Sequence, residues 1–544
     1  MRKNFQFFVF IVALCLTFSI DAFAQRSKKK NNLKGSKPNI IMIVSDDTGW
    51  GDFTSYGGGL GRGIKCPSMD RLDKEGMQFW DFYGQPSCTP GRAAMQTGRI
   101  PNRSGMTTVA FQGQGGGLPA AEWTIAEVLK SAGYQTFFSG KWHLGESDYA
   151  LPNAQGYDIM KNVVLYHLNA YTYTMPSFHP GMTEEQIDFF KKVTTGILEG
   201  KANEPAKEVE KVTKENIGEL DMVMMENVLP QIETYAKSKK PFFMSINFAK
   251  NHQPNIPSKQ FAGTSPAKTK YADAVQELDY NVGRILDKVE EMGIAENTLI
   301  IYTVDNGSWQ DVYPDCGYTP FRGTKGTDRE GGSRVPAYAM WKNVISPGSE
   351  CFDVTGGLDF MATFASLAGV ELPTEDQEGK PTIFDSYDML PLLTGHSSDF
   401  KRDAWYYFTE RELAPGAIRV GRWKFVFNMR GDNGATPGSD KPSPLLGWTG
   451  PEMYVATVPQ VYDLWQDPQE RYDVFMNSFT ESTWTVPMMS LHLEKILNSY
   501  IKYPPRPVQS EGYSGSLTIT RFRELMKING ELKEKGFKFK ITSH

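Results

Sequence analysis

The stretch Asn39-Ile-Ile-Met-Ile-Val-Ser45 is followed directly by Asp46-Asp47-Thr48-Gly49. A continuous apolar run, rather than an alternating one, predicts a strand that is buried on both faces in a parallel sheet covered by helices. Two acids at the carboxyl end of such a strand lie where open α/β sheets bind ligands. An isolated Asp-Asp pair is more often a turn with an Asx cap, so the rest of the chain has to decide between the two interpretations.

The same arrangement recurs along the chain, because several further strand-like runs end in polar residues. These runs are Met77–Tyr83, which leads to Cys88; Tyr134–Ser139, before Lys141 and His143; Pro241–Phe248, before His252; and Thr298–Val304, before Asp305, Asn306 and, farther on, Lys325. Patterns typical of helices separate the runs: Pro67–Glu75, the segment that begins at the capping box Thr124–Glu127, and Tyr271–Met292. The alternation predicts an α/β fold with a large, helix-covered, mostly parallel sheet and a polar edge.

A cysteine pattern, Cys88-Thr-Pro-Gly-Arg92, lies within this series. Pro90 fits the first turn of a helix, and Cys88 and Arg92 then share one helical face. That arrangement places a cation beside a helix N-terminus, where anions bind. Taken alone, the pattern also fits a free buried cysteine at the start of a helix.

The polar residues at the strand ends favour a metal-assisted oxyanion site. Asp46, Asp47, Asp305 and Asn306 offer only oxygen ligands, which suit Ca²⁺ or Mg²⁺ better than Zn²⁺. Three cations, from Arg92, Lys141 and Lys325, are added at the same edge, a combination that fits a tetrahedral oxyanion such as sulfate or phosphate. His143 and His252 are candidate acid–base residues, although either would also fit a structural role. If the strand before Lys141 stays extended, Lys141 and His143 project to the same side.

The order of these motifs resembles the formylglycine-dependent, arylsulfatase-like sulfatases of the alkaline-phosphatase superfamily. The resemblance rests on Asp-Asp, Cys-x-Pro-x-Arg, Gly-Lys-x-His, Asp-Asn and Glu-Gly-Gly-x-Arg-x-Pro, between about Pro38 and Pro336. It resumes weakly at Gly421–Lys424 and Tyr462–Pro468. Two departures are Gly91, where the family usually has Ser, and the absence of a second His beside His252.

The resemblance implies a maturation step and a metal site. A formylglycine-generating enzyme would oxidise Cys88 to an aldehyde, and its hydrate would be the nucleophile. Asp46, Asp47, Asp305 and Asn306, together with the modified Cys88, would bind Ca²⁺, with Mg²⁺ as the alternative. Arg92 and Lys141 would stabilise the hydrate.

The resemblance also implies roles for the remaining site residues. His252 and Lys325 would contact the sulfate ester, with His252 protonating the leaving alcohol. His143 would then take a proton from the modified residue, which expels sulfate. This mechanism agrees with the charge that must be neutralised during attack on a sulfate ester.

The N-terminus predicts export. Residues 1–24 have a basic start, a short apolar run and an Ala-Phe-Ala cleavage site, as in a signal peptide. Lipid attachment at Cys15 is the less favoured alternative, because Leu14 is a poor small-residue neighbour. Residues 25–37 form a basic leader. No later segment is long and apolar enough for a transmembrane helix, so we expect a periplasmic or secreted protein.

The remaining boundaries follow from composition. We expect a catalytic domain at 38–400, with a helical insertion around 160–237 and an irregular, aromatic-rich loop at Tyr166–Phe178. Short antiparallel strands at Trp405–Thr409, Ala417–Asn428 and Val461–Leu464 and a helix at Trp484–Lys502 predict a smaller α+β domain with a tail at 401–544. The five cysteines form no disulfide framework, and Cys316 and Cys351 would pair only if they are close in space.

The sequence therefore predicts an exported sulfatase acting on a sulfated carbohydrate or an aryl sulfate, with the carbohydrate favoured. The formal net charge of −5 argues against a nucleic-acid binder. Two alternatives stay open: a phosphodiesterase or phosphonate monoester hydrolase of the same superfamily, and a non-catalytic sulfoglycan-binding protein. The complete set of Lys141, His143 and Lys325 favours a sulfatase.

Overall fold

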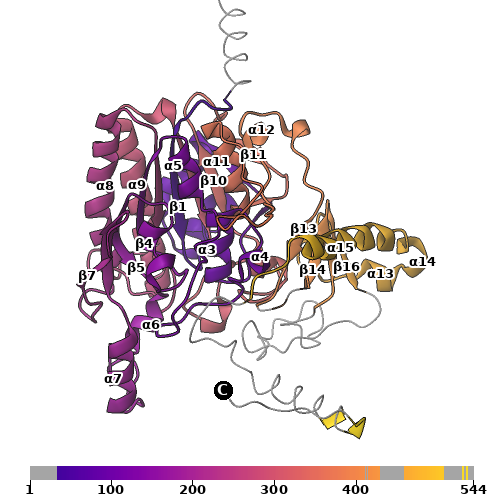
Figure 1. The fold of residues 1–544 in the computed structure, drawn as a ribbon, viewed down its shortest axis with the longest axis horizontal. Helices are drawn as coiled ribbons and strands as arrows, with labels where there is room; N and C mark the ends of the chain where they lie inside the picture. Colours follow the sequence, from indigo (N-terminus) through magenta and orange to yellow (C-terminus); the bar gives the residue numbers. More distant parts are fainter. Residues whose placement is uncertain are drawn as a thin grey trace, which may run out of the picture.

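The computed structural model describes residues 33–428 except 411 and 413, residues 459–507, and residues 530–531 and 534–536. Its centre is a ten-stranded sheet (Figure 1) with the strand order β11-β2-β10-β9-β1-β8-β4-β5-β6-β7. The strands are β1 (Asn39–Ser45), β2 (Met77–Phe79), β4 (Gln135–Lys141), β5 (Ile159–Val164), β6 (Ile197–Lys201), β7 (Lys207–Glu210), β8 (Phe242–Asn247), β9 (Thr298–Val304), β10 (Ala337–Met340) and β11 (Ser349–Cys351).

The opening apolar run forms the middle of this sheet, as predicted. Strand β1 pairs in parallel with β8 on one side and β9 on the other, with Ile43 opposite Ile246 and Tyr302. Every residue of β1 is buried. Since β4 also runs parallel to β8, the carboxyl ends of β1, β4, β8 and β9 meet at one edge of the sheet.

Two layers of helices cover the sheet and account for the burial of β1 on both faces. On one side α9 (Lys270–Glu291) contacts both α2 (Pro67–Glu75) and α8 (Leu220–Ser238). On the other side α3 (Cys88–Thr97), α5 (Ile125–Ser131) and α11 (Phe360–Ala368) contact one another. The predicted capping box is present at the start of α5, where Thr124 and Glu127 bond reciprocally. Shorter helices are α4 (Pro101–Ser104), α6 (Leu168–Thr172), α7 (Glu184–Val193), α10 (Glu330–Ser333) and α12 (Leu390–Leu393).

The prediction of a helical insertion around 160–237 is wrong in part. The segment holds α6, α7 and α8, but β5, β6 and β7 extend the main sheet to its edge. The residues of β7 are all exposed, and three of the four are charged, as is common for edge strands that must not pair with another chain. Such polar composition conceals a strand from a search for apolar runs. The predicted irregular loop Tyr166–Phe178 likewise contains α6.

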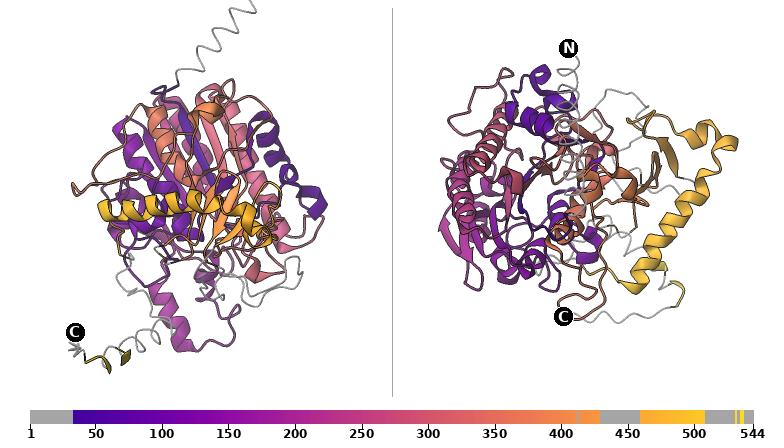
Figure 2. Two further views of the ribbon diagram at one scale, coloured as in Figure 1. Left: turned by 90° about the vertical axis from the view of Figure 1, so that its right-hand side faces the viewer. Right: turned by 90° about the horizontal axis from the view of Figure 1, so that it is seen from above.

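The predicted second sheet is present. Four antiparallel strands, β13 (Trp405–Tyr407), β14 (Ala417–Val420), β15 (Trp423–Val426) and β16 (Gln460–Asp463), follow one another in order. The run expected at Ala417–Asn428 is a hairpin of β14 and β15, whose turn contains Gly421 with a φ of +58°. Figure 2 shows α15 (Thr485–Lys502) as a long rod beside this sheet, near the short helices α13 (Val474–Asn477) and α14 (Phe479–Ser482). A two-stranded sheet of β3 (Phe82–Tyr83) and β12 (Thr355–Gly356) completes the fold.

A buried ionic cluster joins the four-stranded sheet to α10 and β3. Glu330, at the start of α10, accepts hydrogen bonds from Tyr83 (2.7 Å), Tyr407 (2.8 Å) and Lys424 Nζ (3.0 Å). Lys424 lies on β15 and is fully buried, as is Glu330. Burial alone would raise the pKa of Glu330, but Lys424 and the neighbouring arginines outweigh it and lower the pKa to about 2.

We expect Glu330→Gln to lower the free energy of unfolding by about 3 kcal/mol, because the buried Lys424 ammonium keeps only Glu470, at 3.1 Å, as a carboxylate partner. Urea-induced unfolding measures this loss. Because the folded-state pKa lies below the ordinary value of 4.5, the contribution is complete above pH 4.5 and disappears as the pH falls toward 2. The difference between wild type and variant should therefore shrink in that acidic window.

Glu371→Gln is the matched control. Glu371 pairs with Lys34 at 3.5 Å, but both side chains are exposed, so its loss should cost about 0–1 kcal/mol. Equal effects of the two substitutions would show that the Glu330 cluster does not hold the four-stranded sheet against α10 and β3.

Several predictions concern the ends of the chain and the cysteines. The predicted signal peptide, and all of the leader before residue 33, lie outside the described residues. Gly35 bonds to the carbonyl of Ser366 at the end of α11. Cys316 and Cys351 are free thiols, so they form no disulfide. Within the described part of the chain, no helix has the length and apolar character needed to cross a membrane.

Candidate active site

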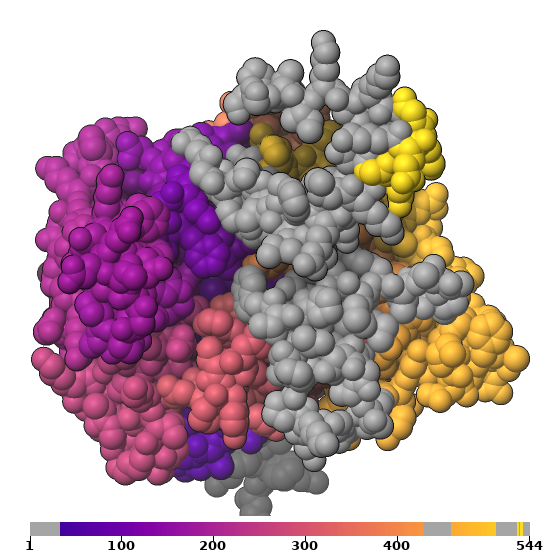
Figure 3. Space-filling view, turned by 90° about the horizontal axis from the view of Figure 1, so that it is seen from below, coloured from indigo at the N-terminus to yellow at the C-terminus, as the bar shows by residue number. Residues whose placement is uncertain are grey.

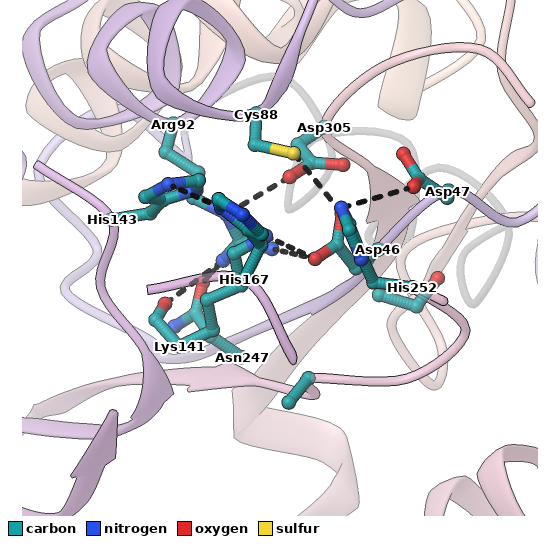
Figure 4. Close-up of polar contacts among 12 residues, drawn as sticks. Asp46, Asp47, Cys88, Arg92, Lys141, His143, His167, Asn247, His252 and Asp305 are labelled. Carbon is teal, nitrogen blue, oxygen red and sulfur yellow. Dashed lines mark hydrogen bonds and ion pairs between the residues drawn. The ribbon is translucent and has the colours of Figure 1, made fainter. Parts of the chain in front are cut away.

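The polar residues at the strand ends converge at one edge of the main sheet. Figure 3 shows the molecule from below, where the purple segment with α6 and α7 and the salmon segment near residue 310 both lie at the surface. Figure 4 shows Cys88 and Arg92 from α3 facing Asp46, Asp47, Lys141 and Asp305 from the strand ends. The predicted site residues therefore lie together in space.

Cys88 is the first residue of α3 and is completely enclosed. Its Sγ lies 3.4 Å from Asp46 Oδ1 and 3.0 Å from Lys325 Nζ. Burial and the charge of Asp46 raise the pKa of the thiol, against the smaller effects of Lys141 and Lys325. The unmodified side chain is therefore a protonated thiol at neutral pH and a weak nucleophile.

Gly91 explains how α3 approaches the metal-ligand candidates so closely. A Cβ atom at this position would lie 2.2 Å from the carbonyl oxygen of Asp305. The departure from the usual family pattern therefore has a structural reason, because a side chain at residue 91 would push α3 away from the end of β9.

Two buried ion pairs involve Asp46 and Asp305, with Lys141 at the end of β4 and with Arg92 on α3. Lys141 Nζ forms an ion pair with Asp46 Oδ2, and Arg92 Nε lies 2.9 Å from Asp305 Oδ2. Burial would raise the pKa of Asp46, but Lys141, His252 and Arg92 together hold that pKa well below its usual value. Burial and the charge of Asp46 raise the pKa of Asp305 to about 6. The second shift reflects carboxylates that face one another.

Asp47 contacts three other residues of the candidate site. Its Oδ1 accepts bonds from Lys325 Nζ and from Asn306 Nδ2, both at 2.7 Å, and its Oδ2 lies 3.6 Å from His252 Nε2. Asp47 has a φ of +54°, a left-handed conformation that Asp tolerates better than most residues. This turn after β1 brings the second carboxylate toward Lys325.

The residues present fit a hard divalent cation. One ligand atom each from Asp46, Asp47 and Cys88 lies within 4.8 Å of the others. Among the described residues, buried oxygens without a hydrogen-bond donor gather in the same place: Asp47 Oδ2, Asp305 Oδ1 and Asn306 Oδ1. Unsatisfied buried oxygens are costly, and a cation would satisfy them.

His143 reaches the site differently from the prediction. Strand β4 ends at Lys141, and His143 has a left-handed backbone with a φ of +58°. The expected extended conformation therefore does not continue from Lys141 to His143. His143 Nε2 lies 3.0 Å from the carbonyl oxygen of Ala110. A carbonyl oxygen only accepts, so Nε2 carries the proton, and Nδ1 is buried with no hydrogen-bond partner among the described residues. Burial and Lys141 lower the pKa of His143 well below its usual value.

His252 lies on the opposite side of the site. Its Nδ1 donates to the carbonyl of Gln253 at 2.8 Å, which directs Nε2 toward Asp47. Burial, opposed by Asp47 and reinforced by Lys325, lowers the pKa of His252 to about 4. The side chain is therefore neutral at pH 7.

Three further residues belong to the site and were missed by sequence reasoning. His167 lies between His143 and His252, with ring centroids 5.2 Å from each. Asn247 Oδ1 accepts from Arg92 at 3.3 Å, and the ring of Trp309 packs 5.1 Å from His252. His167 follows β5, so recognising that strand would have placed it at the same edge.

Comparison with known proteins identifies the family to which the chain belongs. A family model described as Sulfatase matches residues 38–370. The chain belongs to the sulfatase family. This sulfatase is 33% identical over 401 residues to the N-acetylgalactosamine-6-sulfatase of Rattus norvegicus, covering 71% of each chain. It is 32% identical over 448 residues to the arylsulfatase A of Homo sapiens, covering 80% of this chain and 83% of the relative.

Solved structures agree with this assignment. The PsFucS1 sulfatase from Pseudoalteromonas sp. has a TM-score of 0.80 and 29% identity, over 89% of this chain and 95% of that one. A phosphonate monoester hydrolase from Agrobacterium radiobacter, with a TM-score of 0.53, 17% identity and coverage of 86% of this chain and 96% of that one, shares the fold alone. The predicted fold class and membership in the sulfatase family are confirmed, and the chain is a sulfuric ester hydrolase.

Proposed function

We propose that this sulfatase is exported and cleaves the sulfate ester of a sulfated carbohydrate, with Cys88 acting after conversion to formylglycine. The observation that carries the proposal is the position of Cys88 at the start of α3, between Asp46 Oδ1 and Lys325 Nζ. The surrounding acids and bases have the charges that sulfate transfer requires. Family membership supports the modification.

The raised pKa of the Cys88 thiol is a reason for the chain to use a modified residue. A buried protonated thiol beside Asp46 would attack a sulfate ester slowly. Formylglycine supplies a hydrated aldehyde, whose hydroxyl is the nucleophile. The chain's own part is to hold residue 88 at the helix start and to place Lys325 and Lys141 around it.

Asp46, Asp47, Asp305 and Asn306, with the modified Cys88, would hold the metal, for which we favour Ca²⁺ over Mg²⁺. A bound dication supplies Lewis acidity toward a sulfate oxygen and offsets the repulsion between the carboxylates. Arg92 orients the Asp305 carboxylate through the ion pair between Arg92 Nε and Asp305 Oδ2.

The two histidines divide the proton transfers. His143 has its Nε2 proton held by the Ala110 carbonyl, so Nδ1 is the atom that would accept a proton from the hydroxyl at residue 88. On the other side His252 Nε2 would give a proton to the leaving oxygen. The negative charge of the ester beside Nε2 favours the protonated form that this step requires.

The surroundings of the site and the relatives support a carbohydrate as the substrate class. Phe111, His167 and Trp309 line the site with rings, which suits the apolar face of a sugar. Relatives include an N-acetylgalactosamine-6-sulfatase. A panel of sulfated monosaccharides, with 4-nitrophenyl sulfate and 4-nitrophenyl phosphate for comparison, tests the proposal by release of sulfate or phosphate. Faster phosphate than sulfate release would overturn it.

We expect His252→Ala to lower kcat/KM by about 10²-fold or more on a sulfated sugar, and far less on 4-nitrophenyl sulfate. A sugar alcohol is a poor leaving group and needs the proton, whereas a nitrophenolate departs without it. A series of aryl and alkyl sulfates with increasing leaving-group pKa measures the dependence.

His143→Ala is the matched comparison, because its step follows the departure of the alcohol. Its steady-state loss should be independent of the leaving group, after one rapid release of alcohol. Equal losses for His252→Ala across the series would mean that His252 only binds sulfate. Lys325, whose ion pair with Asp47 raises its pKa well above the usual value despite burial, would then be the acid.

A further inference from the structure

His167 is a buried polar side chain of the site to which no step of the proposed reaction assigns a role. It lies just before α6 and is 5% exposed. Figure 4 shows its ring between His143 and His252. Its Nδ1 lies 3.4 Å from His143 Nε2, and no hydrogen bond joins it to Asp46, Asp47 or Cys88 among the described residues.

The hydrogen-bond pattern defines the tautomer of His167. The Ala110 carbonyl requires the proton of His143 on Nε2. Because that N–H also faces His167 Nδ1, a second proton on Nδ1 would oppose it. His167 therefore carries its proton on Nε2. This N–H has no partner among the described residues, and it is not among their fully enclosed unpaired atoms, so it keeps some accessible surface.

The neighbours of His167 place this donor on the leaving-group side. On one side of the His167 ring lies His252, whose Nε2 would approach the leaving oxygen. On another side lies Phe111, with its ring centroid 5.5 Å from that of His167. Phe111 is 38% exposed, so it stands between the enclosed anion site and solvent. The two cations that would bind sulfate form ion pairs with the metal-ligand candidates and not with His167: Lys141 with Asp46, and Lys325 with Asp47.

We propose that His167 is a specificity-determining residue whose Nε2–H donates a hydrogen bond to a ring hydroxyl of the sugar that bears the sulfate. The inference rests on the proposed function, because it needs a carbohydrate leaving group. Phe111 packs beside His167 and Trp309 beside His252, and both rings would contact the apolar faces of the same sugar. A neutral donor in this place selects for a hydroxyl without adding charge to the anion site.

Two substitutions separate the donor role from a positioning role toward His143. In His167→Gln the amide nitrogen can replace Nε2 as donor, whereas in His167→Asn the amide oxygen replaces Nδ1 as the acceptor toward His143. We expect His167→Ala and His167→Asn to lose about 10- to 100-fold in kcat/KM on the best sulfated monosaccharide of the panel. His167→Gln should recover most of this loss, and all three should turn over 4-nitrophenyl sulfate within about 3-fold of wild type.

Monodeoxy analogues of that monosaccharide sulfate identify the hydroxyl. For wild type, one analogue should be about 10- to 100-fold slower than the parent sugar, and His167→Ala should treat the analogue and the parent alike. His179→Ala is the control, since His179 bonds to Thr172 in the same segment and should change neither rate.

The outcomes are distinct. Equal losses of His167→Ala on the sugar and on 4-nitrophenyl sulfate, or rescue by Asn rather than Gln, would show that His167 positions His143 and would overturn the proposal. The absence of any deoxy analogue with a matched loss would also overturn it. If wild type cleaves aryl sulfates but no sulfated sugar, the proposed substrate class itself has failed.

Discussion

Cys88→Ala should abolish sulfate-ester hydrolysis, with a loss on the order of 10⁶-fold, as expected when an enzyme loses its nucleophile. The substitution removes one sulfur atom from the space between Asp46 and Lys325, so it changes little volume and should leave the fold intact. Release of sulfate from 4-nitrophenyl sulfate measures the activity, and circular dichroism checks the fold.

Cys351→Ala is the matched control for this substitution. Cys351 is also a buried free thiol, but it lies on β11 at the far end of the main sheet. Its loss should leave turnover unchanged. If Cys88→Ala retained a substantial fraction of wild-type activity while folded, residue 88 would not be the nucleophile.

Removal of the metal should abolish activity and lower stability together. A ligand present at about 1,000 times its Kd contributes about 4 kcal/mol to the folded state. We therefore expect a chelator to lower the melting temperature by several degrees, because Asp46, Asp47 and Asp305 are left facing one another. Added Ca²⁺ or Mg²⁺ should restore both properties.

Asp305→Asn provides the control for chelation. It removes one of the three carboxylates at nearly unchanged volume, so the variant should be inactive and its melting temperature should respond little to the chelator. Stoichiometric Zn²⁺ as the sole ion in active protein, or a chelator that leaves wild-type stability and activity unchanged, would contradict the all-oxygen site.

The central fold could be predicted because its strands are apolar throughout. The runs at β1 and β9 match the structure residue for residue, since strands buried on both faces leave no room for charge. The outer strands β5, β6 and β7 were missed for the opposite reason. They carry charged, partly exposed side chains, which resemble the polar face of a surface helix.

The same error explains why His167 was missed in the site. Asp46, Cys88 and His252 could be placed at one edge because each follows or adjoins a recognised strand. His167 follows β5, which was not recognised, so its histidine was left in a loop. The contact of His143 with the Ala110 carbonyl depends on a left-handed turn at His143, and no local pattern in the sequence predicts that conformation.

The central claim is that residue 88 acts as an aldehyde rather than as a thiol. Mass spectrometry of the peptide that contains residue 88, from protein whose specific activity has been measured, tests it directly. We predict that the fraction of this peptide with the mass of formylglycine or its hydrate rises in proportion to specific activity across preparations. Fully active protein whose peptide carries only unmodified Cys88 would contradict the account.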